Sequence, residues 1–444
     1  MVKLKRKIDK ILLEWKSDVN HKPLIIKGAR QIGKTFSITK FGKENYDNVI
    51  SINFILQKEY CHIFDDGYDV DVIIKNISFI NPFIQIKPGK TLIFFDEIQS
   101  CTAAATSLKS FCIDGRFDVI CSGSLMGLNY HEIESNAVGY KEDFEMFSLD
   151  FEEFLWAKGY TESVIEEIYL KMKTVIPLST VEFKILDDIF HDYMIVGGMP
   201  AVVESYISNN NFSGTLKIQR QLLSDYEEDI TKYAVGLDKA KILNVYRHIS
   251  IFLAKENKKF QITKIGRNSR NRDYIGVIDW LTSAGIVNVC YGIEHLELPL
   301  KGNYNPDIYK LYYQDTGLFV ASLDEEAQED LRYNHNFDTY KGALYENIVA
   351  DMLRKGGYNL YYYRNEKSTV EIDFIVRNAD SLIPVEVKSG NNATKSLVKL
   401  TSGKVNDIRF GVKLCNKNIG FNGQFFTFPY FLTFMLRRFL REYK

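Results

Sequence analysis

Proline and cysteine are scarce in this chain of 444 residues, and each scarcity excludes a class of protein. With only 9 prolines, long proline-rich linkers are excluded. The 6 cysteines are dispersed and form no Cys-x-x-Cys pair, so we expect neither a zinc or redox motif nor the disulfide framework of a secreted protein. The 7 histidines are equally dispersed, and we assign none of them to a metal.

An excess of charge and a long apolar run are also missing. Lys and Arg number 56 against 57 Asp and Glu, a net charge of −1, which excludes a histone-like or acidic-tailed protein when the chain is taken whole. The apolar stretch 425–436 is too short for a membrane span and is broken by Pro429, so we expect a buried aromatic segment. The first residues lack the apolar core of a signal peptide. These features predict a cytoplasmic protein of roughly two to four domains with no membrane partner.

Strands and helices alternate through residues 1–160, which predicts an α/β fold whose parallel sheet has helices on both faces. Residues 161–235 have mostly helical periodicity, interrupted at Gly197–Pro200, and residues 236–323 predict three helices followed by short strands. An acidic, weakly periodic stretch marks a boundary at 324–340, before a last region at 341–444. The apolar runs that we expect to form the strands of the first region are 24–27, 49–54, 91–95 and 117–122.

Residues 28–35 fit the phosphate-binding pattern Gly-x-x-x-x-Gly-Lys-Ser/Thr, and they follow an apolar strand and precede a helical stretch, as the motif requires. Glycines let backbone N–H groups converge on phosphates, and the helix directs its positive end at the same anion. Lys34 is expected to reach the β- and γ-phosphates of ATP, and the Thr35 hydroxyl to bind Mg²⁺. The residues expected to contact the nucleotide are Gly28, Ala29, Arg30, Gln31, Ile32, Gly33, Lys34 and Thr35.

A second motif, which is acidic, lies 61 residues after Thr35, where the apolar run 92–95 ends in Asp96 and Glu97. A continuous apolar run is expected of a strand buried on both faces. We expect Asp96 to hold the Mg²⁺ shell and Glu97 to polarise the attacking water. The alternative, a strand that ends in a solvated acidic turn, is disfavoured by the ordered pair of motifs.

Another strand ends in small hydroxyl residues at Ser122 and Ser124. One of these hydroxyls is a candidate for contacting the γ-phosphate or the water. The alternative is a plain Ser/Gly turn, which is common.

In this order, the motifs resemble AAA-type ATPases that carry a DUF4143-class C-terminal region. The resemblance implies an α/β fold with a P-loop AAA-like ATPase core over 1–160, a helical lid over 161–235, a winged-helix module over 236–323 and a restriction-endonuclease-like α/β domain of the PD-(D/E)xK type over 341–444. The segments that carry it are KPLIIKGARQIGKT (22–35), LIFFDEIQ (92–99), SLKSF (107–111), SGSLMG (122–127), FEEFL (151–155), GGMP (197–200), YYQDTGLF (312–319), ALYENIVADML (343–353), EIDFIV (371–376) and PVEVKSG (384–390).

The chain departs from the wider AAA pattern because no arginine occurs between Arg116 and Arg220. Oligomeric members of that class complete their site with an arginine finger, which can be worth ~10³–10⁵ in rate. Lys141 is the nearest cation after Ser124, and Tyr140 occupies the place where an arginine is expected. We therefore expect slow intrinsic hydrolysis, or an activating protein or nucleic acid that supplies the missing charge; oligomerisation stays open.

The last region holds a nuclease-like set of residues. Glu386 and Lys388 are two apart, so on a strand both project from one face, and Asp373 lies on a preceding strand joined by the polar turn 378–381. Two carboxylates can hold Mg²⁺ near a phosphodiester, a lysine can orient or deprotonate water, and Glu346 on a helix could complete the metal shell. The resemblance assigns the same roles, whereas the alternative is a solvated strand face with a cross-strand charge pair.

Two features point to DNA as a partner. The helices expected at 239–257, 261–267 and 270–284 have winged-helix order, with cations at Lys264, Arg267, Arg270 and Arg272 where phosphate contacts would form, although such a module can also pack between domains. Residues 391–444 contain ten cations and two anions, a net +8 (10 − 2), interleaved with aromatic residues. A solvated basic helical face is the alternative for this tail.

The sequence therefore predicts an ATP-binding protein, with Mg²⁺, whose ATPase core is coupled to a DNA-directed nuclease-like domain. Lys34, Glu97 and Lys388 are the expected catalytic residues. The alternative is a nucleotide-dependent DNA- or protein-binding switch with an inert nuclease fold.

Overall fold

The structure is a computed structural model that describes residues 4–124, 137–234, 238–253, 259–265, 273–333, 337–365, 370–388, 394–402 and 407–443. The chain forms two compact units. We call Lys5–Ser148, with Ser283–Gly285, the N-terminal unit, and the remainder, mainly Leu149–Thr282 and Ile286–Lys444, the C-terminal unit. Each unit is described by itself.

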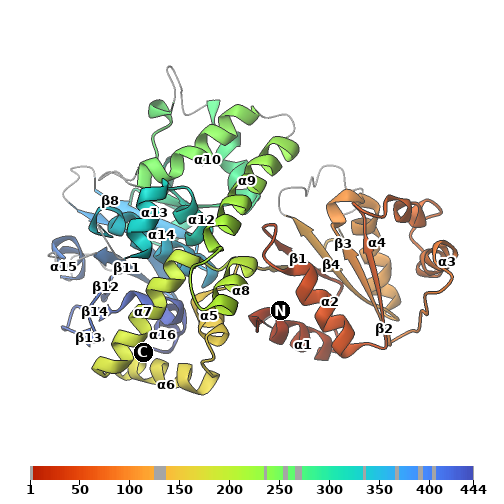
Figure 1. The fold of residues 1–444 in the computed structure, drawn as a ribbon, viewed down its shortest axis with the longest axis horizontal. Coiled ribbons are helices and arrows are strands. Elements are labelled where there is room, and N and C mark those ends of the chain that lie inside the picture. Colours follow the sequence, from red (N-terminus) through yellow and green to blue (C-terminus); the bar gives the residue numbers. More distant parts are fainter. Residues whose placement is uncertain are drawn as a thin grey trace. The chain divides into compact units, whose positions relative to one another are not determined.

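The N-terminal unit is built on a parallel sheet with the strand order β2-β3-β4-β1-β5 (Figure 1). Helices α1 and α2 cover one face of this sheet, and α3 and α4 cover the other, so the predicted layers are confirmed. The strands are β1 (Leu24–Gly28), β2 (Asn48–Asn53), β3 (Thr91–Asp96), β4 (Asp118–Ser124) and β5 (Glu142–Glu145). The helices are α1 (Lys7–Ser17), α2 (Lys34–Asn45), α3 (Val70–Ile80) and α4 (Thr102–Asp114), with short 3₁₀ turns η1 (Lys58–Phe64) and η2 (Ile98–Ser100).

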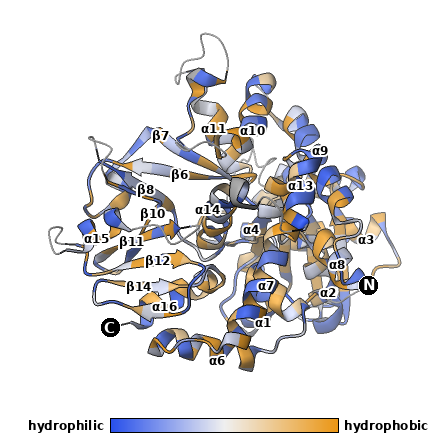
Figure 2. Cartoon of the chain, turned by 60° about the vertical axis from the view of Figure 1, so that its left-hand side comes forward, coloured by the Kyte–Doolittle hydropathy of each residue, from blue (hydrophilic) through white to orange (hydrophobic). Residues whose placement is uncertain are grey.

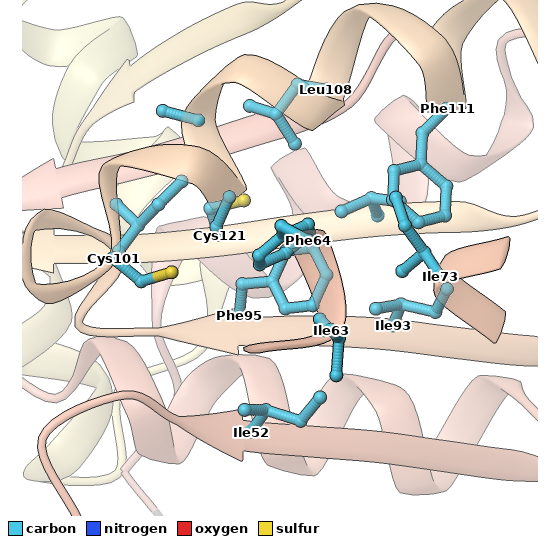
Figure 3. Close-up of a cluster of buried hydrophobic side chains, with 14 of the residues drawn as sticks. Ile52, Ile63, Phe64, Ile73, Ile93, Phe95, Cys101, Leu108, Phe111 and Cys121 are labelled. Atoms are coloured by element: carbon cyan, nitrogen blue, oxygen red, sulfur yellow. The ribbon is translucent and has the colours of Figure 1, made fainter. Parts of the chain in front are cut away.

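Aromatic and β-branched side chains form the core between this sheet and helices α3 and α4 (Figure 3). The ring of Phe95 lies 5.5 Å from that of Phe54 and 6.1 Å from that of Phe111, measured between centroids. Burying a side chain of this size stabilises the fold by roughly 1.5–3 kcal/mol. Because β3 is buried on both faces, the carboxyl end of this strand is held firmly where Asp96 begins the acidic motif.

Four of the strands lie where the sequence predicts them, but β5 has no apolar run that could have revealed it. Its sequence Glu-Asp-Phe-Glu is mostly exposed, and it pairs with β1 alone at the edge of the sheet. Charged residues are common on edge strands because they discourage further pairing. The N-terminal unit ends at Ser148, before the predicted boundary at 160, because α5 (Phe151–Ala157) packs in the C-terminal unit through Phe151, whose ring is 5.3 Å from that of Phe190.

The C-terminal unit begins with a helical region, as predicted for 161–235. Its helix α7 starts with a capping box, in which Ser179 and Glu182 satisfy each other's backbone N–H groups. It ends at Gly197, where a Cβ atom would lie 2.1 Å from Oδ1 of Asp315. The helices are α6 (Glu162–Thr174), α7 (Thr180–Val196), α8 (Pro200–Asn209) and α9 (Thr215–Tyr233).

The winged-helix prediction is not confirmed. Helix α10 (Lys239–Leu253) and helix α11 (Ile275–Ser283) are present, but the middle helix is reduced to the 3₁₀ turn η5 (Ile262–Lys264), and Arg267, Arg270 and Arg272 lie outside the described residues. The following strands β6 (Val287–Ile293) and β7 (Tyr304–Tyr313), with the turn η7 (Leu300–Gly302) between them, do not form a separate wing. Strand β6 pairs in parallel with β8 (Leu360–Arg364), in the sheet β7-β6-β8-β9, so one sheet spans the boundary predicted at 324–340.

The last region is built on a second sheet, with the order β10-β11-β12-β14-β13. In Figure 2 the strands β12 and β14 are coloured largely as hydrophobic, in keeping with their burial. The stretch 425–436 forms β14 and the buried turn η8, as predicted. Strand β9 (Glu371–Ile372) belongs to the first sheet of the unit, next to β8. The strands of the second sheet are β10 (Phe374–Asn378), β11 (Ser381–Lys388), β12 (Gly411–Cys415), β13 (Gly420–Phe421) and β14 (Phe425–Phe428). The remaining elements of the C-terminal unit are α12 (Thr316–Ala321), α13 (Glu325–Arg332), α14 (Phe337–Lys355), α15 (Lys395–Thr401), η8 (Tyr430–Met435) and α16 (Leu436–Glu442).

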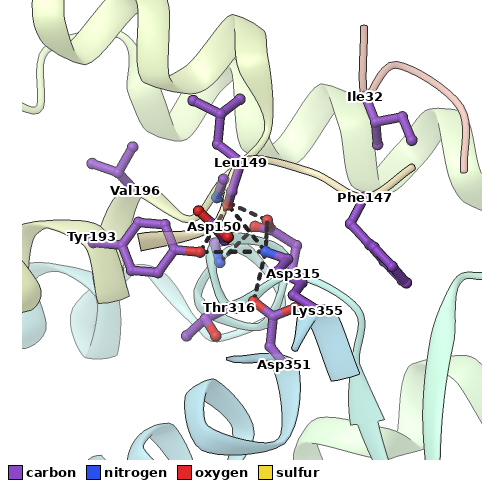
Figure 4. Close-up of polar contacts among 12 residues, drawn as sticks. Ile32, Phe147, Leu149, Asp150, Tyr193, Val196, Asp315, Thr316, Asp351 and Lys355 are labelled. Carbon is purple, nitrogen blue, oxygen red and sulfur yellow. Dashed lines mark hydrogen bonds and ion pairs between the residues drawn. The ribbon is translucent and has the colours of Figure 1, made fainter. Parts of the chain in front are cut away.

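A buried ion cluster joins the parts of the C-terminal unit around Lys355 (Figure 4). Its Nζ donates to Oδ2 of Asp351 at 2.8 Å and to the carbonyl oxygen of Leu149 at 3.1 Å, and it lies 3.9 Å from Oδ2 of Asp315. Asp315 accepts from the backbone N–H of Gly198 at 2.8 Å. This cluster gives a structural role to the Gly-Gly-Met-Pro and Gln-Asp-Thr-Gly segments.

Among the described residues, the structure contains no helix that is both long enough and apolar enough to cross a membrane.

Candidate functional site

The phosphate-binding loop connects β1 to α2, and its backbone is shaped by close contacts. Gly33 has a φ of 94° at the N-cap of α2, in the left-handed region that favours glycine. At Gly28, a Cβ atom would lie 2.3 Å from the carbonyl oxygen of Met146, so only glycine fits. The N–H groups at the start of α2 therefore face the loop, in the arrangement that binds anions.

Lys34 is buried at the start of α2, with 8% of the residue exposed. Its Nζ donates to the carbonyl oxygens of Gly28 at 2.9 Å and Ala29 at 2.7 Å. Burial lowers the pKa of Lys34 to about 8, although the carboxylates of Glu97 and Asp96 act in the opposite direction. A partly desolvated ammonium on the loop is suited to contact an incoming phosphate.

Asp96 is the centre of the polar contacts at the end of β3. The Thr35 hydroxyl donates to both of its oxygens at 3.2 Å, and Nδ2 of Asn53 donates to Oδ2 at 3.0 Å. The Ser122 hydroxyl donates to Oδ1. Only 4% of Asp96 is exposed, so the three donors hold its carboxylate in one orientation next to the loop.

Glu97 has a left-handed backbone, with φ 56° and ψ 47°. This conformation is uncommon for a residue other than glycine, and it occurs where surrounding structure fixes the backbone. Nε2 of Gln99 donates to Oε2 of Glu97. Glu97 is thus turned away from the line of β3 and held by a neighbour.

Ser122 and Ser124 lie on β4, which runs between β3 and β1. Ser122 pairs in register with Ile26, and Ser124 with Gly28, the first residue of the loop. Both serines are buried. The structure therefore brings both predicted hydroxyls to the loop, and it joins Ser122 to Asp96.

Arg6 contributes to the site, although sequence reasoning did not find it. It precedes α1 and is buried, with Nη1 donating to the carbonyl oxygen of Ile32 at 2.9 Å and Nη2 to that of Phe147 at 2.8 Å. Arg6 therefore fastens the loop to the segment that follows β5. A lone arginine in a charged N-terminal segment carries no sequence signal for this role. Asn53, which donates to Asp96, could have been identified as a site residue from its place at the end of a predicted strand.

The residues of the loop and of β3 fit ATP and Mg²⁺. The glycine cradle at Gly28 excludes a side chain, Lys34 presents a cation, and the Thr35 hydroxyl and the Asp96 carboxylate lie within hydrogen-bond distance of each other. Hydroxyl and carboxylate oxygens are the ligands that Mg²⁺ prefers. Lys141, the cation nearest to the missing arginine finger in the sequence, pairs with Asp143 at 3.1 Å.

The C-terminal unit contains the β-hairpin that the sequence predicts around the turn 378–381, whereas the nuclease-like fold predicted for this region is not confirmed. Strand β10 pairs antiparallel with β11 across the turn 378–381, and Asp373 lies just before β10. Nζ of Lys388 is 2.5 Å from Oε1 of Glu386, and Oδ2 of Asp373 accepts from the backbone N–H of Val387 at 2.8 Å. The three predicted side chains therefore meet at one end of the hairpin.

The charged side chains at this end of the hairpin shift one another's pKa values. Burial and the nearby charge of Asp373 raise the pKa of Glu386 to about 7, and its Oε2 is buried without a hydrogen-bond partner in the described part of the chain. Burial lowers the pKa of Lys388, but Glu386 and the other carboxylates outweigh burial and raise it. A lysine held in its protonated form orients water rather than deprotonating it.

A further lysine, Lys310 on β7, was not anticipated at this place. Its Nζ lies 3.0 Å from Oε1 of Glu346 and 3.4 Å from Oε1 of Glu371, and only 2% of its side chain is exposed. The hydroxyl of Tyr312 donates to the same oxygen of Glu346 at 2.5 Å. Over the residues described, no group of three or more His, Cys, Asp or Glu side chains is placed to hold a metal, so the Glu346, Asp373 and Glu386 set does not fit a metal as it stands.

Comparisons with known proteins support the first site and leave the second without a known function. A family model described as an AAA domain matches residues 20–155. Models described as domains of unknown function match residues 187–329 and, as DUF4143, residues 341–431. The match at 187–329 runs across the boundary predicted at residue 235.

One protein resembles the chain in sequence over most of its length, and several solved structures resemble it in fold. An uncharacterized protein of Methanocaldococcus jannaschii is 24% identical over 373 residues, which are 81% of this chain and 73% of that protein. A Walker-type ATPase of Pyrococcus abyssi has 15% identity and a TM-score of 0.43, covering 72% of this chain and 96% of its own. The branch migration motor RuvB of Thermotoga maritima has 13% identity and a TM-score of 0.30, covering 67% and 91%. Structural likeness at these scores carries no functional argument.

The chain thus matches an AAA domain over residues 20–155, which include the phosphate-binding loop, and DUF4143 over residues 341–431.

Proposed function

We propose that the chain binds ATP with Mg²⁺ at residues 28–35 and hydrolyses it. The observation that carries this proposal is the convergence of Thr35, Ser122 and Asn53 on Asp96, next to a loop whose lysine is desolvated. A solvated acidic turn would not have its carboxylate buried to 4% exposure and held by three side-chain donors.

Each residue of the proposed site has its own role in binding or hydrolysing ATP. Lys34 and the N–H groups at the start of α2 bind the phosphates, and Thr35 and Asp96 hold Mg²⁺, which neutralises phosphate charge when bound. Glu97 orients the attacking water and accepts its proton, and the left-handed backbone at this residue keeps its carboxylate in place. Ser122 keeps Asp96 oriented, so we assign it a positioning role, and Ser124, in register with Gly28 on the neighbouring strand, is the hydroxyl that we expect to contact the γ-phosphate or the water.

Turnover by the chain alone is expected to be slow, because no arginine lies between residues 117 and 219 and Lys141 is paired with Asp143. Phosphate release from the wild-type chain, Lys34→Ala and Lys40→Ala tests the proposal. Lys40 lies on α2 and pairs with Asp9 at 2.7 Å, so it is a matched lysine outside the loop. Turnover that Lys34→Ala leaves intact would contradict the proposed site, and fast turnover without any partner would contradict the need for an activator.

A second candidate function is phosphodiester cleavage of DNA by the C-terminal unit, coupled to the nucleotide state. It is favoured by the meeting of Asp373, Glu386 and Lys388 and by the unpartnered Oε2 of Glu386. Buried carboxylates with raised pKa values gather at functional sites more often than elsewhere.

The alternative is a nucleotide-dependent DNA- or protein-binding switch whose nuclease fold is inert. Lys310 favours it, because its buried ammonium already neutralises Glu346, the carboxylate expected to complete a metal shell. The fold of the region does not decide between the two functions.

One experiment separates them. Supercoiled, linear and single-stranded DNA are incubated with wild type, Lys388→Ala and the exposed-lysine control Lys399→Ala, with and without ATP and Mg²⁺. The nuclease proposal expects strand cleavage that Lys388→Ala abolishes while ATP turnover is kept. If the wild-type chain cuts no DNA under any condition, the switch is the better account.

A further inference from the structure

The C-terminal unit contains a hollow of ≈ 960 Å³ that none of the motifs above uses. Its walls are the turn 378–381 between β10 and β11, residues 299–301, 357–359 and 361, Arg409 with Phe410, and helix α16 with Tyr443. Pockets for small ligands typically measure about 300–1,000 Å³, so this hollow is large enough for a nucleotide. We call it the basic hollow.

Positive charge dominates the lining of the basic hollow. Five cations face one carboxylate, a net +4 (5 − 1). The carboxylate, Asp380, pairs with Arg409, since its Oδ2 lies 3.5 Å from Nη2 of the arginine, and both side chains are mostly exposed. In the described chain neither Lys301 nor Arg441 has a carboxylate within ion-pair distance, so both are available to an anion. The lining cations are Lys301, Arg377, Arg409, Arg437 and Arg441.

Arg437 is fixed in place within this lining. Its Nη1 donates to the carbonyl oxygen of Gly356 at 2.5 Å, and its guanidinium lies 5.2 Å from the ring centre of Tyr358. A Cβ atom at Gly357 would lie 2.0 Å from the same nitrogen, so a glycine is needed to let the guanidinium pass. A cation that is held in this way loses little entropy when it contacts a ligand.

Aromatic rings form another part of the wall. The rings of Phe410 and Tyr443 lie 5.3 Å apart in an edge-to-face arrangement, and Tyr361 lines the hollow as well. Cations that bind phosphates, next to rings on which a base can stack, are the combination that recognises single nucleotides and the ends of single strands.

The basic hollow is separate from both sites described above. It lies at the 378–381 turn, whereas Asp373, Glu386 and Lys388 lie at the other end of the same hairpin. Five residues along β10 correspond to about 15 Å. The positive charge of residues 391–444 is therefore gathered in part here, through Arg409, Arg437 and Arg441, while Lys404 and Lys444 lie outside the described residues.

We propose that the basic hollow binds a nucleotide unit, with the phosphate between Lys301, Arg437 and Arg441 and the base against Phe410 and Tyr443. The unit is either a free nucleotide or the end of a single strand. The proposal does not depend on hydrolysis at the phosphate-binding loop or on cleavage at the hairpin, so its failure leaves those functions untouched.

The test measures binding by isothermal titration calorimetry with the full chain carrying Lys34→Ala, which removes the loop as a competing nucleotide site. The probes are AMP and a 5′-phosphorylated thymidine hexanucleotide. In this background, Lys301→Gln with Arg441→Gln removes the two available charges, and Lys10→Gln with Lys90→Gln, two exposed lysines of the N-terminal unit, is the matched control. Unchanged melting temperatures show that both variants are folded.

We expect the double variant to bind at least roughly tenfold more weakly than the control, and to depend less on salt, because two phosphate contacts are lost. Tighter binding of the hexanucleotide than of AMP assigns the hollow to a strand end, and equal binding assigns it to a free nucleotide. The proposal is overturned if neither probe binds at millimolar concentration, or if the double variant binds as well as the control.

Discussion

Replacing Arg6 with alanine should weaken both the N-terminal unit and its affinity for ATP. The buried guanidinium donates to the carbonyl oxygens of Ile32, within the loop, and of Phe147, after β5. A hydrogen bond to a charged group contributes about 1.5–3 kcal/mol. Since water can reach the carbonyls once the side chain is gone, we take the low end for each bond and expect a loss of about 3 kcal/mol.

For a unit of this size, such a loss corresponds to a fall of roughly 10 °C in melting temperature. Differential scanning calorimetry of the full chain measures it as a shift of one unit's transition, and calorimetric titration should show ATP binding weakened about tenfold, since about 1.4 kcal/mol of loop ordering is lost. The control is Lys10→Ala, because Lys10 pairs with Glu14 on an exposed face, where such pairs contribute little. If Arg6→Ala matches this control in both measurements, the fastening role is refuted.

Other predictions follow from single contacts. Because burial lowers the pKa of Lys34 to about 8, ATP affinity should fall above pH 8, and binding at pH 9 should take up close to one proton. Calorimetric titration in buffers of different ionisation enthalpy measures the proton uptake. Uptake that persists in Lys34→Arg would contradict the assignment of the proton to Lys34. Gly28→Ala should abolish ATP binding, because its Cβ would lie 2.3 Å from the Met146 carbonyl oxygen, whereas Gly420→Ala, with open space around it, should bind normally. Lys355→Met should destabilise the C-terminal unit by about 3–5 kcal/mol in denaturant unfolding, because it leaves the buried carboxylates of Asp351 and Asp315 without their cation. Lys173→Ala, which removes a surface ion pair, is the control and should change the stability little.

The proposed ATP site could be predicted from the sequence because its chemistry is local. The glycines, Lys34 and Thr35 lie within residues 28–35, and Asp96 ends an apolar run that predicts a buried strand. Parallel strands bring their carboxyl ends to one edge, so the meeting of Asp96 with Thr35 and Ser122 follows from the strand order. Arg6 could not be predicted, since its partners are backbone carbonyls, and a carbonyl leaves no trace in the side-chain pattern.

The C-terminal unit was predicted less well because its pairings are distant in sequence. The hairpin that carries Asp373 and Glu386 joins neighbouring strands through a short turn, and it was found. The pairing of β6 with β8 joins residues that are 70 apart in the sequence, Cys290 and Leu360, and no periodicity encodes it. A separate winged helix was therefore expected where one sheet continues. The contact of Lys310 with Glu346 was missed for the same reason, because Lys310 lies on β7, whose place in that sheet could not be predicted.

Comparison of Glu97→Gln with wild type, in ATP binding and in phosphate release, tests most directly whether the loop hydrolyses ATP. The variant should bind ATP as wild type does, because Lys34, Thr35 and Asp96 are intact, and its turnover should fall by roughly 10²–10⁴, the contribution expected of a positioned base. Undiminished turnover in Glu97→Gln, or a wild-type chain that binds no ATP in the presence of Mg²⁺, would show that ATP hydrolysis does not occur at this site as proposed.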